Sequence, residues 1–148
     1  MTSKKITLMF ALSFLIMFII TYSMVYVFDH ALFNINKIYM AALMVGAMAI
    51  INVLVMGSMY QNKSLKRWLL VTGILVTGLS FYFIRNQTMV GDSQFLKAMI
   101  PHHSSAILMC EKAKITDPEI KNLCNNIVQT QKEEIEIMQQ KLDNYKAN

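Results

Sequence analysis

Residues 99–110 gather most of the side chains in this chain that can bind a soft metal ion. The segment is Met-Ile-Pro-His-His-Ser-Ser-Ala-Ile-Leu-Met-Cys and holds two of the three histidines and one of the two cysteines. Each residue of a helix advances by about 100°. At this spacing, five side chains of the segment lie on one side of the helix: Met99, His102, His103, Met109 and Cys110. Imidazole, thioether and thiol together favour Cu(I) over hard, oxygen-seeking cations. The pattern predicts a soft-metal site, with Cu(I) as its metal.

Each predicted ligand has a simpler alternative. Met99 and Met138 lie on apolar stripes, where methionine commonly fills gaps in a core. The adjacent histidines are harder to explain in this way, because an inward imidazole without a partner has a desolvation cost. The cysteines, Cys110 and Cys124, have three interpretations: a disulfide, as an exported domain favours, copper thiolates, or small buried hydrophobic side chains. His30 is either an accessory ligand or, as is commoner, an interfacial polar residue.

Three uncharged runs precede this segment and predict membrane helices. They cover residues 6–28, 38–60 and 68–84, and a span needs about 20 residues. The first run is too long for a signal peptide and no cleavage site follows it, so it predicts an uncleaved anchor. Small residues in the second and third runs predict close helix packing, namely Ala42, Gly46, Ala49, Gly73, Thr77 and Gly78. The expected fold is all-α, with a membrane domain over residues 1–85 and an external helical domain over residues 86–148.

The positive charge belongs to the flanks of these runs. The chain has a net charge of +5; residues 1–85 carry seven basic residues against Asp29, whereas residues 86–148 carry seven against eight acids. Nucleic-acid binding is therefore not expected. Lys4, Lys5 and the basic residues at 63, 66 and 67 share one side of three spans, and the positive-inside rule puts that side in the cytoplasm. We predict a protein of the inner or plasma membrane whose C-terminal domain is periplasmic or extracellular.

The C-terminal domain is predicted to be a helical hairpin. One helix starts at Asp92 or Ser93 and runs towards Lys112, and Pro101 should kink or restart it because proline deletes a helical hydrogen bond. A second helix starts near Thr116-Asp117-Pro118-Glu119, where Thr116 and Glu119 have the spacing of a capping box, and extends to about Tyr145. A turn near residue 115 sets His103 opposite about residue 128. Gln131 and Glu134 on the inner face either orient an imidazole or lie at a solvated edge.

Three stretches of this domain resemble one known family. They are Phe95-Leu-Lys-Ala-Met-Ile-Pro-His-His-Ser-Ser-Ala-Ile-Leu-Met, Asp117-Pro-Glu-Ile and Ile127-Val-Gln-Thr-Gln-Lys-Glu-Glu-Ile-Glu-Ile-Met. The resemblance is to the domain of unknown function 305 family, over about residues 89–145. It implies an exported or membrane-anchored protein of ferritin-like type, with copper binding in some members. It also implies candidate ligands at Met99, His102, His103, Met109 and Met138, whereas Cys110 and Cys124 depart from the pattern.

Together these features predict a membrane-anchored copper protein that buffers, sequesters or hands over Cu(I). The candidate ligands are Met99, His102, His103, Met109, Cys110 and Met138, with Gln131 and Glu134 behind them. We find no nucleophile–base pair and no phosphate loop, so an enzyme is not expected. The expected partners are copper, the bilayer, and a second copy or another membrane protein. The alternatives are a non-metal membrane interaction protein whose C-terminal helices bind a partner, and a thiol redox protein using Cys110 and Cys124.

Overall fold

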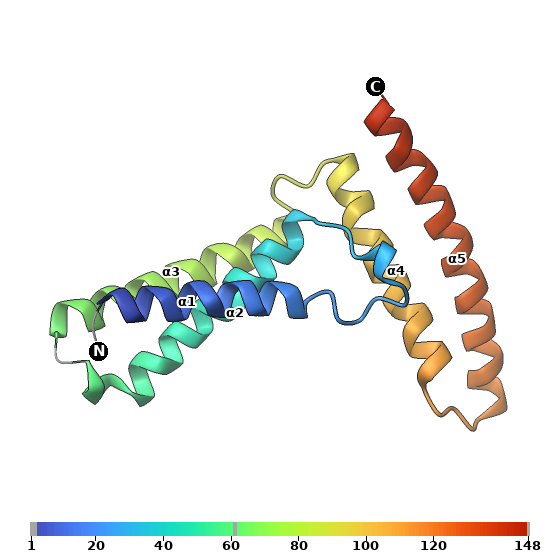
Figure 1. Cartoon of the computed structure of the whole chain (residues 1–148). Helices are drawn as coiled ribbons and strands as arrows, with labels where there is room; N and C mark the ends of the chain where they lie inside the picture. Colours follow the sequence, from blue (N-terminus) through green and yellow to red (C-terminus); the bar gives the residue numbers. More distant parts are fainter. Residues whose placement is uncertain (1–2, 61, 148) are drawn as a thin grey trace. The chain divides into compact units, whose positions relative to one another are not determined.

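The computed structural model describes residues 3–60 and 62–147, and over these residues the protein is all-α, as predicted (Figure 1). Five α-helices follow one another: α1 (Ser3–Ile20), α2 (Ile35–Val55), α3 (Lys63–Asn86), α4 (Asp92–Lys112) and α5 (Pro118–Ala147). Two short 3-10 helices, η1 (Phe28–His30) and η2 (Gly57–Met59), lie in the connections after α1 and α2. The described residues form no strand.

The chain divides into two compact units. One unit contains residues 1–21 and 36–89, and therefore α1, α2 and α3. The other contains residues 22–35 and 90–148, and therefore η1 with α4 and α5. The segment at residues 22–35, which we call the strap, thus belongs with the C-terminal hairpin although it joins α1 to α2.

Among the described residues, two helices rather than the three predicted are long and apolar enough to cross a membrane: α2 and α3. The prediction of one continuous span over residues 6–28 is wrong, because α1 ends at Ile20. From Ile6 to Ile20 a helix is about 22 Å long at 1.5 Å per residue, against a hydrocarbon core of about 30 Å. After Ile20 the sequence is Thr-Tyr-Ser-Met-Val-Tyr-Val, rich in β-branched and aromatic residues of modest helix propensity.

The small residues of α2 and α3 let these two helices cross closely, as predicted. A Cβ atom added to Gly46 would lie 2.6 Å from Thr77 Oγ1 and 3.1 Å from the Gly73 carbonyl oxygen. A Cβ atom added to Gly73 would lie 3.1 Å from the Gly46 carbonyl oxygen and 3.3 Å from Ala49 Cβ. A larger side chain at either glycine would force the backbones apart, so the sequence selects glycine at the crossing.

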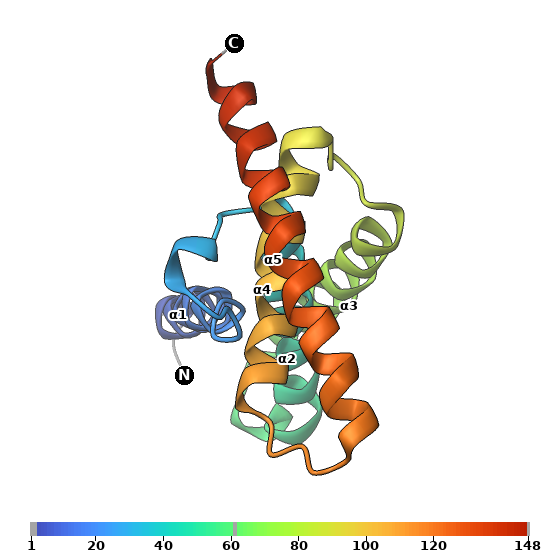
Figure 2. The same cartoon turned by 90° about the vertical axis from the view of Figure 1, so that its right-hand side faces the viewer.

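The second unit is built on the predicted hairpin of α4 and α5, which lie side by side in both views (Figures 1 and 2). The helix ends at Lys112 and about residue 145 are confirmed. Asp117, rather than Thr116, caps α5, because its Oδ1 accepts from the N–H groups of Glu119 (2.8 Å) and Ile120 (3.1 Å). The hairpin buries one apolar cluster, made by Leu96, Ile100, Ile107, Ile135, Met138 and Leu142.

Pro101 lies inside α4 without ending it, and the strap explains how. Proline has no N–H, so the carbonyl of Lys97, four residues earlier, loses its helical donor. The Asn34 side-chain amide donates to that carbonyl at 3.2 Å and also to the Leu32 carbonyl at 3.0 Å. Asn34 is only 1% exposed, so water cannot replace it. The helix therefore continues through Pro101, so of the two predicted outcomes, a kink or a restart, the restart is wrong.

Two more contacts fasten the strap to α4. The Tyr26 N–H donates to Ser104 Oγ at 2.8 Å, and the Ile35 N–H donates to Gln94 Oε1 at 3.0 Å. Ser104 is fully buried. Polar side chains of α4 thus accept hydrogen bonds from backbone N–H groups of the strap, which would otherwise be costly to bury.

Candidate metal site on the helical hairpin

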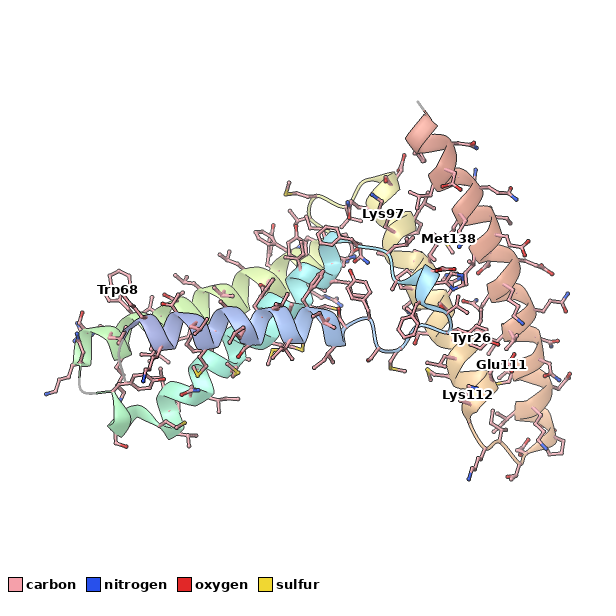
Figure 3. The ribbon with its side chains drawn as sticks, viewed as in Figure 1. Tyr26, Trp68, Lys97, Glu111, Lys112 and Met138 are labelled. Carbon is pink, nitrogen blue, oxygen red and sulfur yellow. A yellow bond between two sulfur atoms is a disulfide. The ribbon has the colours of Figure 1, made fainter. Side chains whose placement is uncertain are left out.

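Three of the predicted ligands lie near one another in the hairpin. Met99 is partly buried and packs against the apolar cluster that contains Met138. Met138 is 9% exposed and lies on the side of α5 that faces α4 (Figure 3). His103 follows Met99 by one helical turn on α4. Two thioethers and one imidazole therefore share this part of the hairpin.

His103 is held by a carboxylate from α5. Its side chain is 12% exposed, and its Nδ1 lies 3.0 Å from Glu134 Oε2. Nδ1 finds no partner of hydrogen-bond geometry in the described chain, so the two groups approach closely without an aligned hydrogen bond. The Gln131 side-chain amide donates to the same carboxylate oxygen at 3.4 Å. In metal sites a carboxylate at one ring nitrogen orients the imidazole and leaves the other nitrogen for the ion.

The surroundings of His103 favour its neutral form, which is the form that binds metals. Burial lowers the pKa of His103 below its usual value, although Glu134 acts to raise it; His102 also lowers it. Because the unfolded chain then binds this proton more tightly, the contribution of neutral His103 to stability is fully present above about pH 6.5 and is lost as pH falls through the lowered pKa of the folded state. The neutral imidazole is thus the favoured form at neutral pH.

Replacing Glu134 by glutamine should lower the pKa of His103 further, because the carboxylate that favours the imidazolium is removed. An NMR titration of the metal-free protein measures this pKa directly. Glu133→Gln is the matched control, since Glu133 is exposed and accepts a hydrogen bond from Gln129 at 3.1 Å. The electrostatic role of Glu134 would be refuted by equal His103 titrations in all three proteins.

The remaining histidines and Met109 are placed differently. His102 is exposed, with its ring centroid 6.0 Å from that of His103, so it lies at the rim of the site. Met109 is 58% exposed and ten residues after Met99, about 15 Å along the helix. Met109 and Met99 therefore cannot share one ion.

His30 Nδ1 lies 3.0 Å from Ser104 Oγ, and burial lowers the pKa of His30 while Asp29 raises it.

Cys110 forms a disulfide with Cys124, with the two Cα atoms 5.3 Å apart. A sulfur in a disulfide has no thiolate to offer a metal, so Cys110 leaves the predicted ligand set while the bond is intact. The observed pairs of residues also show that the predicted register between α4 and α5 was wrong. Cys110 lies opposite Cys124 and His103 lies beside Glu134, whereas the expected partner of His103 was about residue 128.

Sequence reasoning missed the roles of Asn34 and Ser104 in supporting the helix that carries the histidines. The only available signal was Pro101, which implied that the Lys97 carbonyl needs another donor. In the described chain, no three His, Cys, Asp or Glu side chains are arranged to hold a metal ion.

Comparisons with known proteins agree with the hairpin pattern. The family model described as domain of unknown function (DUF305) matches residues 83–142, which contain all of α4 and most of α5. The chain is also 36% identical over 115 residues to the uncharacterized protein L153 of Acanthamoeba polyphaga mimivirus, across 76% of this chain and 74% of the relative. The chain belongs to the DUF305 family. No solved structure matches it. The DUF305 match begins near the end of α3, so it covers the candidate ligands of the hairpin but neither the strap nor α2.

Proposed function

We propose that this DUF305 protein is a membrane-anchored Cu(I)-binding protein that buffers, sequesters or hands over copper. The observation that carries the proposal is the approach of Glu134 to His103 Nδ1 at 3.0 Å. That arrangement suits a metal-ligating imidazole. Met99 and Met138 supply thioether sulfurs in the same part of the hairpin, and thioether together with imidazole is a donor set that favours Cu(I).

The ligands that we propose are His103 Nε2 and the sulfurs of Met99 and Met138. His102, at the exposed rim, would receive or release the ion. Gln131 and Glu134 would act on the site through the His103 ring. Met109 lies too far along α4 to join this site and would at most take part in transfer to a partner. In this proposal copper is the cargo of the protein.

The membrane part of the proposal is a three-helix anchor with an external hairpin. The apolar helices α2 and α3 supply two spans, and we propose that the shorter α1 is also inserted, with Lys4 and Lys5 on the cytoplasmic side. The Cys110–Cys124 disulfide supports an external hairpin, because disulfides persist in oxidising compartments and are rare in the cytosol.

Replacing Met99 by leucine together with His103 by glutamine should abolish most Cu(I) binding at the hairpin. Both replacements are close in volume, so the helical content should stay near that of the parent protein. The measurement is a competition titration of the oxidised full chain in detergent with a Cu(I) chelator. We expect at least a tenfold loss of affinity, which corresponds to about 1.4 kcal/mol.

The matched control is Met109→Leu, which removes a thioether from the same helix outside the proposed site. It should leave the Cu(I) affinity unchanged. If the double variant binds Cu(I) as tightly as the parent protein, the cluster is a packed core and not a metal site.

The proposed orientation in the membrane can be tested by proteolysis of intact cells. In intact cells, a protease should cut the exposed turn between α4 and α5, and reduction should then separate the two pieces. The basic flank at residues 63–67 should resist cleavage until the membrane is opened. Protection of the α4–α5 turn in intact cells would reverse the proposed orientation.

A further inference from the structure

The disulfide lies at the turn end of the hairpin, away from most of its apolar core. It joins α4 to α5 near the connection at residues 113–117. The buried core extends from Ile107 back to Leu96 on α4 and from Ile135 to Leu142 on α5. At the far end, the Tyr145 hydroxyl donates to Asp92 at 3.1 Å. The register that brings Cys110 and Cys124 together therefore does not depend on their bond alone.

A cavity of about 350 Å³ opens beside this disulfide. It is lined by both cysteines, Val128 and Asn125, and by Glu111 and Lys132, which form an ion pair with a nitrogen–oxygen distance of 4.0 Å. Figure 3 labels Glu111 at this end of α4. Reduction requires a thiolate to reach one sulfur of the disulfide, and the cavity provides that access. The opposite charges of Glu111 and Lys132 leave its wall with no strong preference for the charge of the reductant.

We propose that reduction of this disulfide creates a second Cu(I) site, made by the thiolates of Cys110 and Cys124. The reductant is an external dithiol, of small-molecule or protein type. It supplies two electrons and two protons, becomes a disulfide itself, and leaves Cys110 and Cys124 as two thiols. One Cu⁺ ion then replaces the two thiol protons, which pass to solvent. Copper keeps its oxidation state throughout.

The backbone geometry suits such a site. The two Cα atoms are 5.3 Å apart, and a bound ion needs the sulfurs to separate to about two metal–sulfur bonds, each about 2.3 Å as for zinc. Rotation of the two side chains into the adjoining cavity provides this separation without parting the helices. Thiolates are strong ligands for Cu(I).

The second site is separate from the one proposed above. Cys110 follows His103 by seven residues, about 10 Å along α4, so one ion cannot occupy both. The proposal shares the metal with the proposed function but does not depend on the Met99 and His103 ligands. It makes the copper capacity of the hairpin depend on the supply of reducing equivalents.

The test compares the oxidised and reduced full chain in detergent. The protein is reduced with a small dithiol, freed of the reductant without air, and titrated with Cu(I) against a competing chelator. We expect one more Cu(I) per chain in the reduced protein, together with the ultraviolet charge-transfer absorption of Cu(I)–thiolate bonds. The Met99→Leu, His103→Gln variant should keep this gain, which separates the result from that of the first site.

The control is the Cys110→Ser, Cys124→Ser variant, in which the reducing treatment should add no copper. Equal copper content in the oxidised and reduced parent proteins would overturn the proposal. So would a disulfide that the dithiol cannot open in the folded protein, as judged by thiol alkylation. A gain accompanied by loss of helical circular dichroism would also overturn it, because the cysteines would then bind from an unfolded hairpin.

Discussion

Replacing Asn34 by alanine is expected to destabilise the C-terminal unit by about 2–3 kcal/mol, because the Lys97 carbonyl would lose its donor in a buried setting. Pro101 cannot supply the missing N–H, and Asn34 is 1% exposed in the parent protein. The measurement is denaturant unfolding of the full chain in detergent, followed through the helical signal of the hairpin. The variant should also speed hydrogen exchange of amides in the middle of α4.

A double-mutant cycle isolates the cause. Pro101→Ala restores a backbone N–H that can donate to the Lys97 carbonyl, so Asn34→Ala should cost clearly less in that background. The remaining cost should reflect the Asn34 contact with the Leu32 carbonyl at 3.0 Å. If the two changes simply add, then Asn34 stabilises the strap in some other way and does not compensate for the proline.

Removing the disulfide should have an effect of similar size. For the Cys110→Ser, Cys124→Ser variant, the sequence separation of 14 residues predicts a loss of about 3 kcal/mol in unfolding free energy. Reduction of the parent protein should give nearly the same loss in the same denaturant experiment. The copper-free hairpin should remain helical at 25 °C, because its apolar cluster and the Tyr145–Asp92 contact are intact. A cost below about 0.5 kcal/mol would show that the bond does not constrain the unfolded chain.

The elements of the hairpin were predictable because local signals agree there. Apolar spacing places Ile100, Ile107 and Met138 on inner faces, and Pro118 marks the start of α5. The approach of Glu134 to His103 depends on the register between two helices, which the loop length alone does not determine. The expected partner of His103 was therefore wrong by about six residues, while Glu134 itself was among the residues predicted to support an imidazole.

The first apolar run shows why composition cannot replace geometry. Residues 6–28 lack charge except at the boundary with Asp29, and this pattern is compatible with a helix of any length within the run. Beyond the helix end at Ile20, the chain instead contacts distant residues, as in the hydrogen bond from the Tyr26 N–H to Ser104 Oγ. That partner is 78 residues away in the sequence, beyond the reach of any local pattern.

Copper binding stays a prediction, and it rests on the side-chain types of the candidate ligands rather than on the fold. The sequence pointed to thioether and imidazole groups as candidate donors. The structure adds the Glu134 carboxylate beside His103 and the disulfide that joins Cys110 to Cys124. Met109 illustrates the limit of a helical-wheel argument. It shares a side of α4 with Met99, yet the rise of the helix separates them by about 15 Å.

The strap also determines the order in which parts of this protein can fold. Its backbone and side-chain groups pair with residues 59 to 78 positions later, at Gln94, Lys97 and Ser104. During synthesis from the N-terminus, residues 22–35 therefore wait until α4 has left the ribosome before they find these partners, and such distant contacts form slowly. A fragment that begins after residue 85 would contain the whole DUF305 match from α4 onward and still lack the donor for the Lys97 carbonyl. The boundary of the family pattern is thus not the boundary of the folding unit.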